Sequence, residues 1–391
     1  MARNIITGID IGTYNIKVVV AEYETKDSKL PSIIGSGFSE SRGLRYGYII
    51  NINDVKSSLK KAIEQAEKTS KVKIKKAYIS TGGISLDSLV SNGSTMISRG
   101  DSEITDMDID KAIESSEKNI PHQEITNKKI IHTIPLSYKI DGKTVLGRPV
   151  GMKGIKFEVS TLFVTCLDQH YQDLLQAVQE TGIEVENVIA APIAASLVAL
   201  SRAQKIAGVV LANIGSETVS IIVYDNNIPI SVKVFPIGST HITNDIALGL
   251  KIPLEEAEKI KLGALTRTDF SKRKLDEIII ARLTDMFEMI DSHLKKIHRN
   301  GLLPAGIIIT GGGSGISTTE DLARATLKLP SKIAQIKYPT DSKIQIKDSY
   351  WTVAYGLCVL GFTDEEESSI GIRIAKNTKN NLISWIKQIL P

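Results

Sequence analysis

One strand–turn–strand pattern occurs twice in this sequence, once near the N-terminus and once near the middle. Residues 8–20 (GIDIGTYNIKVVV) are matched in outline by residues 211–223 (LANIGSETVSIIV). Each copy has an apolar strand, then Asp or Asn, Ile, Gly and a hydroxyl residue, and after three further positions a second β-branched strand, which predicts a β-hairpin with a tight polar turn. A single copy favours an ordinary turn. Two copies indicate two related halves.

The turns have the chemistry of a phosphate site. Gly12 and Gly215 let the backbone come close to a ligand, and the hydroxyls of Thr13 and Ser216, with neighbouring amides, can donate to phosphate oxygens. A third glycine cluster, residues 311–315, follows an apolar strand and precedes a predicted helix over 318–327. This cluster lacks the Walker ending and the dinucleotide spacing, and a strand-to-helix glycine turn alone is weak evidence. Facing hairpins would hold a phosphate chain between them.

In their order along the chain, these three motifs resemble the actin, Hsp70 and sugar-kinase superfamily. Within it, residues 129–142 (KIIHTIPLSYKIDG) and 148–154 (RPVGMKG) are similar to the signature of the FtsA cell-division family. The resemblance covers nearly the whole chain. It implies an α/β, two-lobed actin-like ATPase fold with ribonuclease H-like duplicated domains and an FtsA-type inserted subdomain.

The same resemblance implies the domain organisation. The first lobe core is expected at 1–83, continued by 166–200 and 346–361, with an SHS2-like inserted subdomain at 84–165. The second lobe core is expected at 201–237 and 301–345, with its own subdomain at 238–300. A flexible linker at 362–379 and an amphipathic helix at 380–391 follow.

ATP and Mg²⁺ are the cofactors that the resemblance implies, with Asp10 orienting the metal through water. Glu258 and Lys261 match the family's ribose-contacting motif, although by themselves they indicate an exposed i,i+3 pair. The residues expected around the nucleotide are Asp10, Gly12, Thr13, Tyr14, Asn15, Lys17, Asn213, Gly215, Ser216, Glu217, Thr218, Glu258, Lys261, Gly311, Gly312, Gly313 and Ser314.

Two residues argue against fast hydrolysis. Asn213 stands where the second hairpin often carries another aspartate, and Ala191 where many members of the superfamily have Gln or Glu to position water. Because metal-held charge and water positioning carry most of phosphoryl-transfer catalysis, we expect ATP binding with slow or negligible hydrolysis and no confident catalytic residue. A sugar or small-molecule kinase is the alternative, but it needs a catalytic carboxylate for which the sequence offers no convincing candidate. A pilus-assembly relative would share the hairpins and lack the tail.

The resemblance also implies protein partners. The subdomain at 238–300 is expected to receive the C-terminal peptide of the tubulin-like protein FtsZ, with Arg282, predicted to point outward from a helix over 275–297, as a candidate contact. An arginine that is simply solvated is the alternative. Other divisome proteins are expected on the inserted subdomain, together with self-association into filaments.

The last segment forms an amphipathic stripe. Its broad apolar face, with Lys387 among the opposite polar residues, predicts a helix lying on anionic lipid; the alternative is a terminal helix docked on the core. The expected membrane residues are Leu382, Ile383, Trp385, Ile386, Lys387, Ile389 and Leu390. The expected location is therefore peripheral, on the cytoplasmic side of the cell membrane at the division septum.

Composition excludes several other classes. A formal net charge of +4 from 48 basic and 44 acidic residues does not favour nucleic acid as a partner. Cys166 and Cys358 lie in separate apolar runs, which favours neither a disulfide nor a zinc site. We find no secretory signal pattern, and the longest apolar run, 188–200, is shorter than the roughly 20 residues of a spanning helix, so we expect a buried helix. We also expect His132 to be a buried strand histidine.

Overall fold

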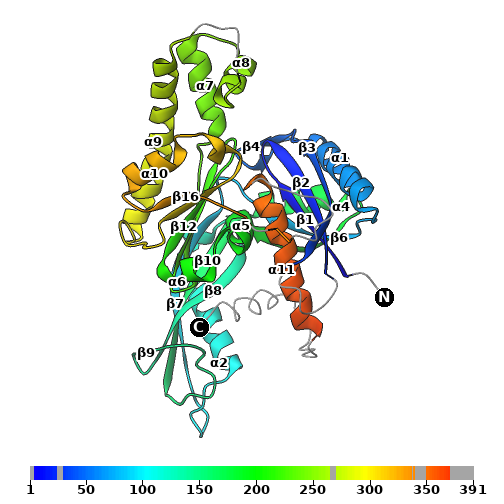
Figure 1. Cartoon of the computed structure of the whole chain (residues 1–391). Coiled ribbons are helices and arrows are strands. Elements are labelled where there is room, and N and C mark those ends of the chain that lie inside the picture. The colour runs from blue at the N-terminus through cyan, green and yellow to red at the C-terminus, as the bar shows by residue number, and fades with distance from the viewer. Residues whose placement is uncertain (1–3, 24–29, 265–269, 337, 340–348, 370–391) are drawn as a thin grey trace.

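The computed structural model describes residues 4–23, 30–264, 270–336, 338–339 and 349–369, with only the backbone of 364–369. Figure 1 shows two lobes, a helical projection at one end and, at the other, an elongated sheet beside which lies α2 (Asp106–Lys118). The first lobe holds β1, β2 and β3, and the second lobe holds β12 and its neighbours.

The first lobe is built on a five-stranded sheet in the order β11-β6-β1-β2-β3. These strands are β1 (Asn4–Ile11), β2 (Asn15–Tyr23), β3 (Ser32–Glu40), β6 (Lys76–Thr81) and β11 (Glu184–Ala190). One face is covered by α1 (Ile52–Ser70) and α4 (Asp168–Gln179). Asn51 caps α1 by accepting from the amides of Asn53 and Asp54, and Val55, Leu59 and Ile63 bury one stripe of this helix, as their spacing predicts.

The second lobe and the inserted subdomain share one nine-stranded sheet, in the order β16-β15-β12-β13-β14-β7-β10-β8-β9. The strands of the second lobe are β12 (Val209–Ile214), β13 (Val219–Asp225), β14 (Ile228–Phe235), β15 (Ile307–Thr310) and β16 (Ser331–Ile333), with α6 (Arg202–Ala207) and α10 (Thr319–Leu327). Those of the inserted subdomain are β7 (Asp87–Met96), β8 (Lys128–Ile140), β9 (Lys143–Val145) and β10 (Lys156–Leu167), with α2 (Asp106–Lys118) and α3 (His122–Ile125).

The inserted subdomain thus continues the sheet of the second lobe, although its sequence interrupts the first. Asp87 pairs with Lys233 in the β7–β14 register, and their side chains form an ion pair of 2.6 Å. Ser88 Oγ adds a hydrogen bond of 2.9 Å to the Val232 carbonyl. Sequence order alone does not predict this attachment.

Three helices form the projection at the top of Figure 1: α7 (Ser239–Leu250), α8 (Leu254–Lys261) and α9 (Lys272–Lys296). The buried face of α9 includes Leu283, Phe287, Ile290 and Leu294, which join the core of the second lobe.

Two helices run between the lobes, α5 (Ala191–Ala199) and α11 (Thr352–Ser369), the latter preceded by the short turn η2 (Ser349–Trp351). They touch where Gly356 meets Ala194, because a Cβ on Gly356 would lie 2.0 Å from the Ala194 carbonyl oxygen. Residues 188–190 of the long apolar run belong to β11, and the buried helix expected in this run is α5, which begins at Ala191 with Pro192 in its first turn. α11 continues through Ser369 and so includes residues 362–369 of the linker expected at 362–379.

Buried titratable groups follow their surroundings. His132 is 1% exposed on β8, as predicted, and its Nε2 accepts from the Ala190 amide at 2.9 Å, while burial lowers its pKa to about 3. Cys166 and Cys358 are free and buried, and burial raises both thiol pKa values to about 12.

Among the helices of the described ranges, none is long and apolar enough to cross a membrane.

Candidate functional site

A cavity of about 360 Å³ lies between the two hairpin turns. The β1–β2 hairpin of the first lobe and the β12–β13 hairpin of the second both line it, as do α8 and the turn after β15. The predicted residues that line it are Asp10, Gly12, Thr13, Tyr14, Asn15, Lys17, Asn213, Gly215, Ser216, Thr218, Glu258, Lys261, Gly311 and Gly312. Segments far apart in sequence therefore meet here.

The first hairpin carries a buried ion pair. Asp10 and Lys17 face each other in the strand register, and Lys17 Nζ lies 2.8 Å from Asp10 Oδ2. Ser80 Oγ, from the neighbouring strand β6, donates to Asp10 Oδ1 at 2.9 Å. Both carboxylate oxygens therefore have a partner, as a buried charge requires.

Tyr350 of η2 covers this pair. Lys17 Nζ lies 4.2 Å from the centre of the Tyr350 ring, a cation–π distance, and the Tyr350 hydroxyl contacts the side-chain amide of Asn15. Burial is the main reason why the pKa of Tyr350 rises to about 12, so the hydroxyl stays protonated. The sequence carried no local signal for Tyr350, because the contact joins opposite ends of the chain.

The second hairpin repeats the geometry with neutral groups. Asn213 faces Ser220 in the register, at the positions that correspond to Asp10 and Lys17. Gly311, with φ of +92°, lies against Asn213: a Cβ there would come within 2.2 Å of Asn213 Oδ1. The backbone after β15 therefore closes on the second hairpin at a point where only glycine fits.

Three predicted nucleotide residues do not line the cavity. Gly313 packs on Ile214, and Ser314 is 3% exposed and donates to the Gly311 carbonyl at 2.7 Å. Glu217 points toward the first lobe, where its carboxylate accepts from the Tyr46 amide. Gly313 and Ser314 therefore stabilise the conformation of the glycine loop, through packing and a hydrogen bond, and Glu217 joins the two lobes.

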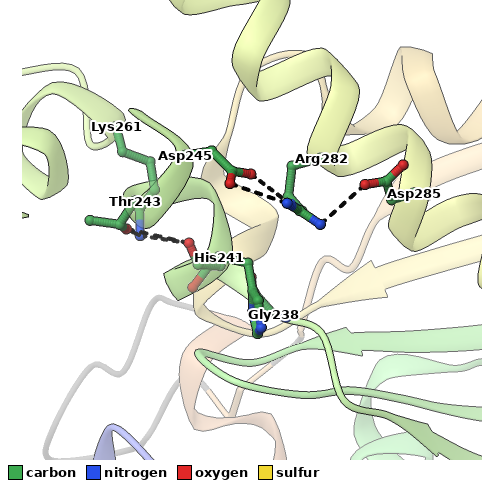
Figure 2. Close-up of polar contacts among 8 residues, drawn as sticks. Gly238, His241, Thr243, Asp245, Lys261, Arg282 and Asp285 are labelled. Carbon is green, nitrogen blue, oxygen red and sulfur yellow. Dashed lines mark hydrogen bonds and ion pairs between the residues drawn. The ribbon is translucent and has the colours of Figure 1, made fainter. Parts of the chain in front are cut away.

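Glu258 and Lys261 form the helical wall of the cavity. Lys261 Nζ lies 2.7 Å from Glu258 Oε2 and 3.0 Å from Thr243 Oγ1 on α7, and its side chain is only 6% exposed (Figure 2). The alternative of an exposed charged pair is therefore wrong for Lys261. This ammonium faces the cavity while remaining paired.

Arg282 of α9 is held by two carboxylates rather than pointing freely outward as expected. Its Nε and Nη2 donate to Asp245 on α7 at 2.6 and 3.1 Å, and its Nη1 donates to Asp285 at 3.1 Å (Figure 2). The hydrogen bonds to Asp245 are the largest cause of the raised pKa of Arg282. With 29% of its side chain exposed, Arg282 joins α7 to α9.

The cavity fits a phosphate–magnesium group better than a bare metal. Within the described ranges, no group of three or more His, Cys, Asp or Glu residues could hold a metal ion, and the carboxylates that line the cavity are Asp10 and Glu258. Mg²⁺ is commonly held by one or two carboxylates together with substrate phosphates and water. The glycine turns and Asp10 suit that combination.

Other residues that line the cavity were not predicted from the sequence, among them Gly47, Ser80, Gly82, Gly83, Ser239, Thr240, Tyr350 and Thr352. A signal existed for Gly82 and Gly83, because Gly-Gly follows strand β6 directly. The membrane residues expected at 382–390 lie outside the described residues.

Comparisons with known proteins agree with this architecture. The sequence matches the family model of cell division protein FtsA over residues 210–356 and that of the SHS2 domain inserted in FtsA over 83–165. The cell division protein FtsA of Borreliella burgdorferi is 31% identical over 355 residues, covering 85% of each chain. That of Bacillus subtilis is 29% identical over 377 residues, covering 91% of this chain and 83% of the relative.

Solved structures agree on the fold. The PilM-PilN type IV pilus biogenesis complex gives a TM-score of 0.66 at 16% identity, covering 91% of this chain and 98% of that one. MreB5 of Spiroplasma citri, solved bound to ADP, gives 0.55 at 13% identity, with 94% and 99% covered. The predicted two-lobed actin-like ATPase fold is confirmed. Together with the two sequence matches, it shows that this chain belongs to the FtsA family of cell-division proteins.

Proposed function

We propose that the chain binds ATP with Mg²⁺ in the cavity between the hairpins and uses the nucleotide as a conformational switch. The observation that carries this proposal is the convergence of two glycine turns, one from each lobe, on one cavity with a buried carboxylate and two ammonium groups. A triphosphate needs donors and positive charge on both sides, and this arrangement supplies them.

Each group has a part in binding. The turns at Gly12 and Gly215 present amides and the hydroxyls of Thr13 and Ser216, and Lys17 neutralises phosphate charge from the first lobe. Glu258 accepts from ribose hydroxyls, with Lys261 beside it. When bound, Mg²⁺ would be oriented by Asp10 through water and would shield the phosphate charge.

Hydrolysis is expected to be slow or negligible. Ala191 lines the cavity with a methyl group, and Asn213 is neutral, so neither side chain can act as a base toward water. Asp10 and Glu258 both have cationic partners within 2.8 Å, which also argues against a kinase that needs an unpaired base.

A binding titration with a fluorescent ATP analogue tests this site. Lys261→Ala should weaken binding about tenfold because a nearly buried cation next to the ligand is lost. Lys259→Ala is the matched control, since Lys259 is exposed on the same helix and does not line the cavity. Equal effects of the two variants, or no binding by the unmodified chain, would contradict the proposal. Brisk ATP turnover abolished by Asp10→Ala would contradict slow hydrolysis.

The proposed cellular role follows from the family. We propose that the chain tethers FtsZ filaments to the cytoplasmic face of the membrane at the septum through its C-terminal helix, and that it forms filaments there. The α7–α9 projection, where Arg282 lies, would receive the FtsZ peptide, and the inserted subdomain would bind other divisome proteins. Co-sedimentation with anionic liposomes tests the tether. The full chain should pellet, and a truncation ending before Asn381 should stay in solution; equal pelleting would overturn the proposal.

A further inference from the structure

Glu217 bridges the lobes instead of facing the cavity. It belongs to the turn of the second hairpin, yet its carboxylate accepts a hydrogen bond of 2.5 Å from the Tyr46 amide in the first lobe. Arg45 Nε lies 3.9 Å from the same carboxylate. The side chain of Glu217 is 21% exposed and that of Arg45 is 66% exposed, so the hydrogen bond is the stronger of the two contacts.

The receiving segment is a tight hairpin, β4 (Leu44–Arg45) and β5 (Tyr48–Ile49), that lies between the lobes in Figure 1. Its two turn residues have positive φ, +48° at Tyr46 and +81° at Gly47, the pattern of a type I′ turn. Such a turn directs the Tyr46 amide and carbonyl outward, away from the two-strand pairing. Tyr46 adopts a left-handed conformation that most side chains avoid, and two outside contacts hold it there.

The second contact of Tyr46 leads to the inserted subdomain. Its carbonyl accepts from the Ile84 amide at 3.2 Å, and the Leu86 amide in turn donates to the Gly83 carbonyl at 3.0 Å. Gly47 and Gly83 are so close that a Cβ on Gly47 would lie 2.3 Å from Gly83 Cα. Residues 83–86 directly precede β7, which continues the sheet of the second lobe. Tyr46 therefore contacts the second hairpin through its amide and the root of the inserted subdomain through its carbonyl.

We propose that Glu217 is a positioning residue. Through the main chain of Tyr46, it transmits the binding of nucleotide at the second hairpin to the root of the inserted subdomain at 83–86. The turn of this hairpin is the part that would move with phosphate, because Gly215 and Ser216 line the cavity and Glu217 follows them. The inference rests on the proposed nucleotide site and adds its regulatory output.

Hydrogen–deuterium exchange of the full chain with and without Mg·ATP tests the coupling. In the unmodified chain, ATP should slow exchange in the segment around Ile84 and Leu86 by about fivefold, because closure of the two lobes around ATP would strengthen the hydrogen bonds of these amides. Glu217→Ala should reduce that response to below about twofold while ATP still binds, as measured by titration of the same sample. Glu217→Gln keeps an acceptor for the Tyr46 amide and should keep the response.

Two further variants separate coupling from general destabilisation. Tyr46→Gly retains the main-chain groups and should retain the response, and Glu288→Ala removes an exposed carboxylate from α9 and serves as the matched control. A full response in Glu217→Ala, or a lost response in Tyr46→Gly or Glu217→Gln, would overturn the proposal. So would an unmodified chain that binds ATP without any change at 83–86. An unmodified chain that binds no ATP would instead overturn the proposed nucleotide site.

Discussion

The two hairpins have one backbone geometry and two different chemistries. At matching register positions the first hairpin places Asp10 opposite Lys17, and the second places Asn213 opposite Ser220. At the turn, Tyr14 of the first hairpin is 60% exposed, whereas Glu217 of the second bonds to the other lobe. The duplicated shape thus supplies two turns that line one cavity, while the buried ion pair belongs to the first hairpin and the interlobe bridge to the second.

The largest expected effect concerns the stability of the charged hairpin. Asp10→Ala should lower the free energy of unfolding by about 3–5 kcal/mol, because it leaves the Lys17 ammonium buried and unpaired. Asn213→Ala should lower it by about 1 kcal/mol, the scale of a neutral hydrogen-bonding group. Urea denaturation without nucleotide measures both. Equal losses from the two variants would contradict the difference in charge between the hairpins. Adding Lys17→Met to Asp10→Ala removes the unpaired ammonium and should recover most of the loss.

The next largest effect concerns how strongly ATP binding depends on Mg²⁺ in variants of the two hairpins. In the unmodified chain, removing Mg²⁺ with a chelator should weaken ATP binding about tenfold, because the Asp10 carboxylate then faces unshielded phosphate charge. Asp10→Asn makes the first hairpin like the second and should lose most of this dependence, whereas Asn213→Asp should increase it. Fluorescence titrations in Mg²⁺ and in chelator report the ratio. An unchanged ratio in Asp10→Asn would contradict the role of Asp10.

The glycine turns should behave alike. A Cβ on Gly12 would lie 2.9 Å from the Asn15 carbonyl oxygen, and one on Gly215 would lie 3.0 Å from that of Thr218. Gly12→Ala and Gly215→Ala should therefore each weaken ATP binding by a similar factor, about five- to tenfold. Gly100→Ala, where a Cβ meets nothing within 4 Å, is the control. A large effect at only one turn would show that the hairpins do not share the phosphate chain.

The smallest effect is expected at the tip of the first turn. Tyr14→Ala should change the free energy of unfolding by less than about 0.5 kcal/mol because the side chain is mostly exposed. Glu217→Ala should lower it by about 1.5–3 kcal/mol, the scale of a charged hydrogen bond. Thermal and urea melts measured side by side resolve the difference. A larger loss of stability from Tyr14→Ala than from Glu217→Ala would contradict the assignment of the interlobe bridge to Glu217.

Much of the site could be predicted because it is encoded locally. Alternating β-branched residues around a short Gly turn predict a hairpin whatever the rest of the chain does, and this places Asp10, Gly12, Asn213 and Gly215 at equivalent points. The repeat then supplies the expectation of two lobes. Glu217 and Thr218 are neighbours in the same turn, and the sequence predicted both as nucleotide residues. In the structure Glu217 bridges the lobes, whereas Thr218 lines the cavity.

Local sequence was enough to predict the two hairpins, the glycine loop after β15 and the amphipathic pattern of the last residues of the chain, since each depends on neighbours within a few positions. The packing of distant segments, by contrast, places Ser80 and Tyr350 beside the Asp10–Lys17 pair, holds Arg282 against Asp245 and joins the inserted subdomain to the sheet of the second lobe. These contacts join distant segments, and their geometry follows from how whole lobes pack. A periodic pattern records which face of an element is apolar, but not which distant side chain will meet it.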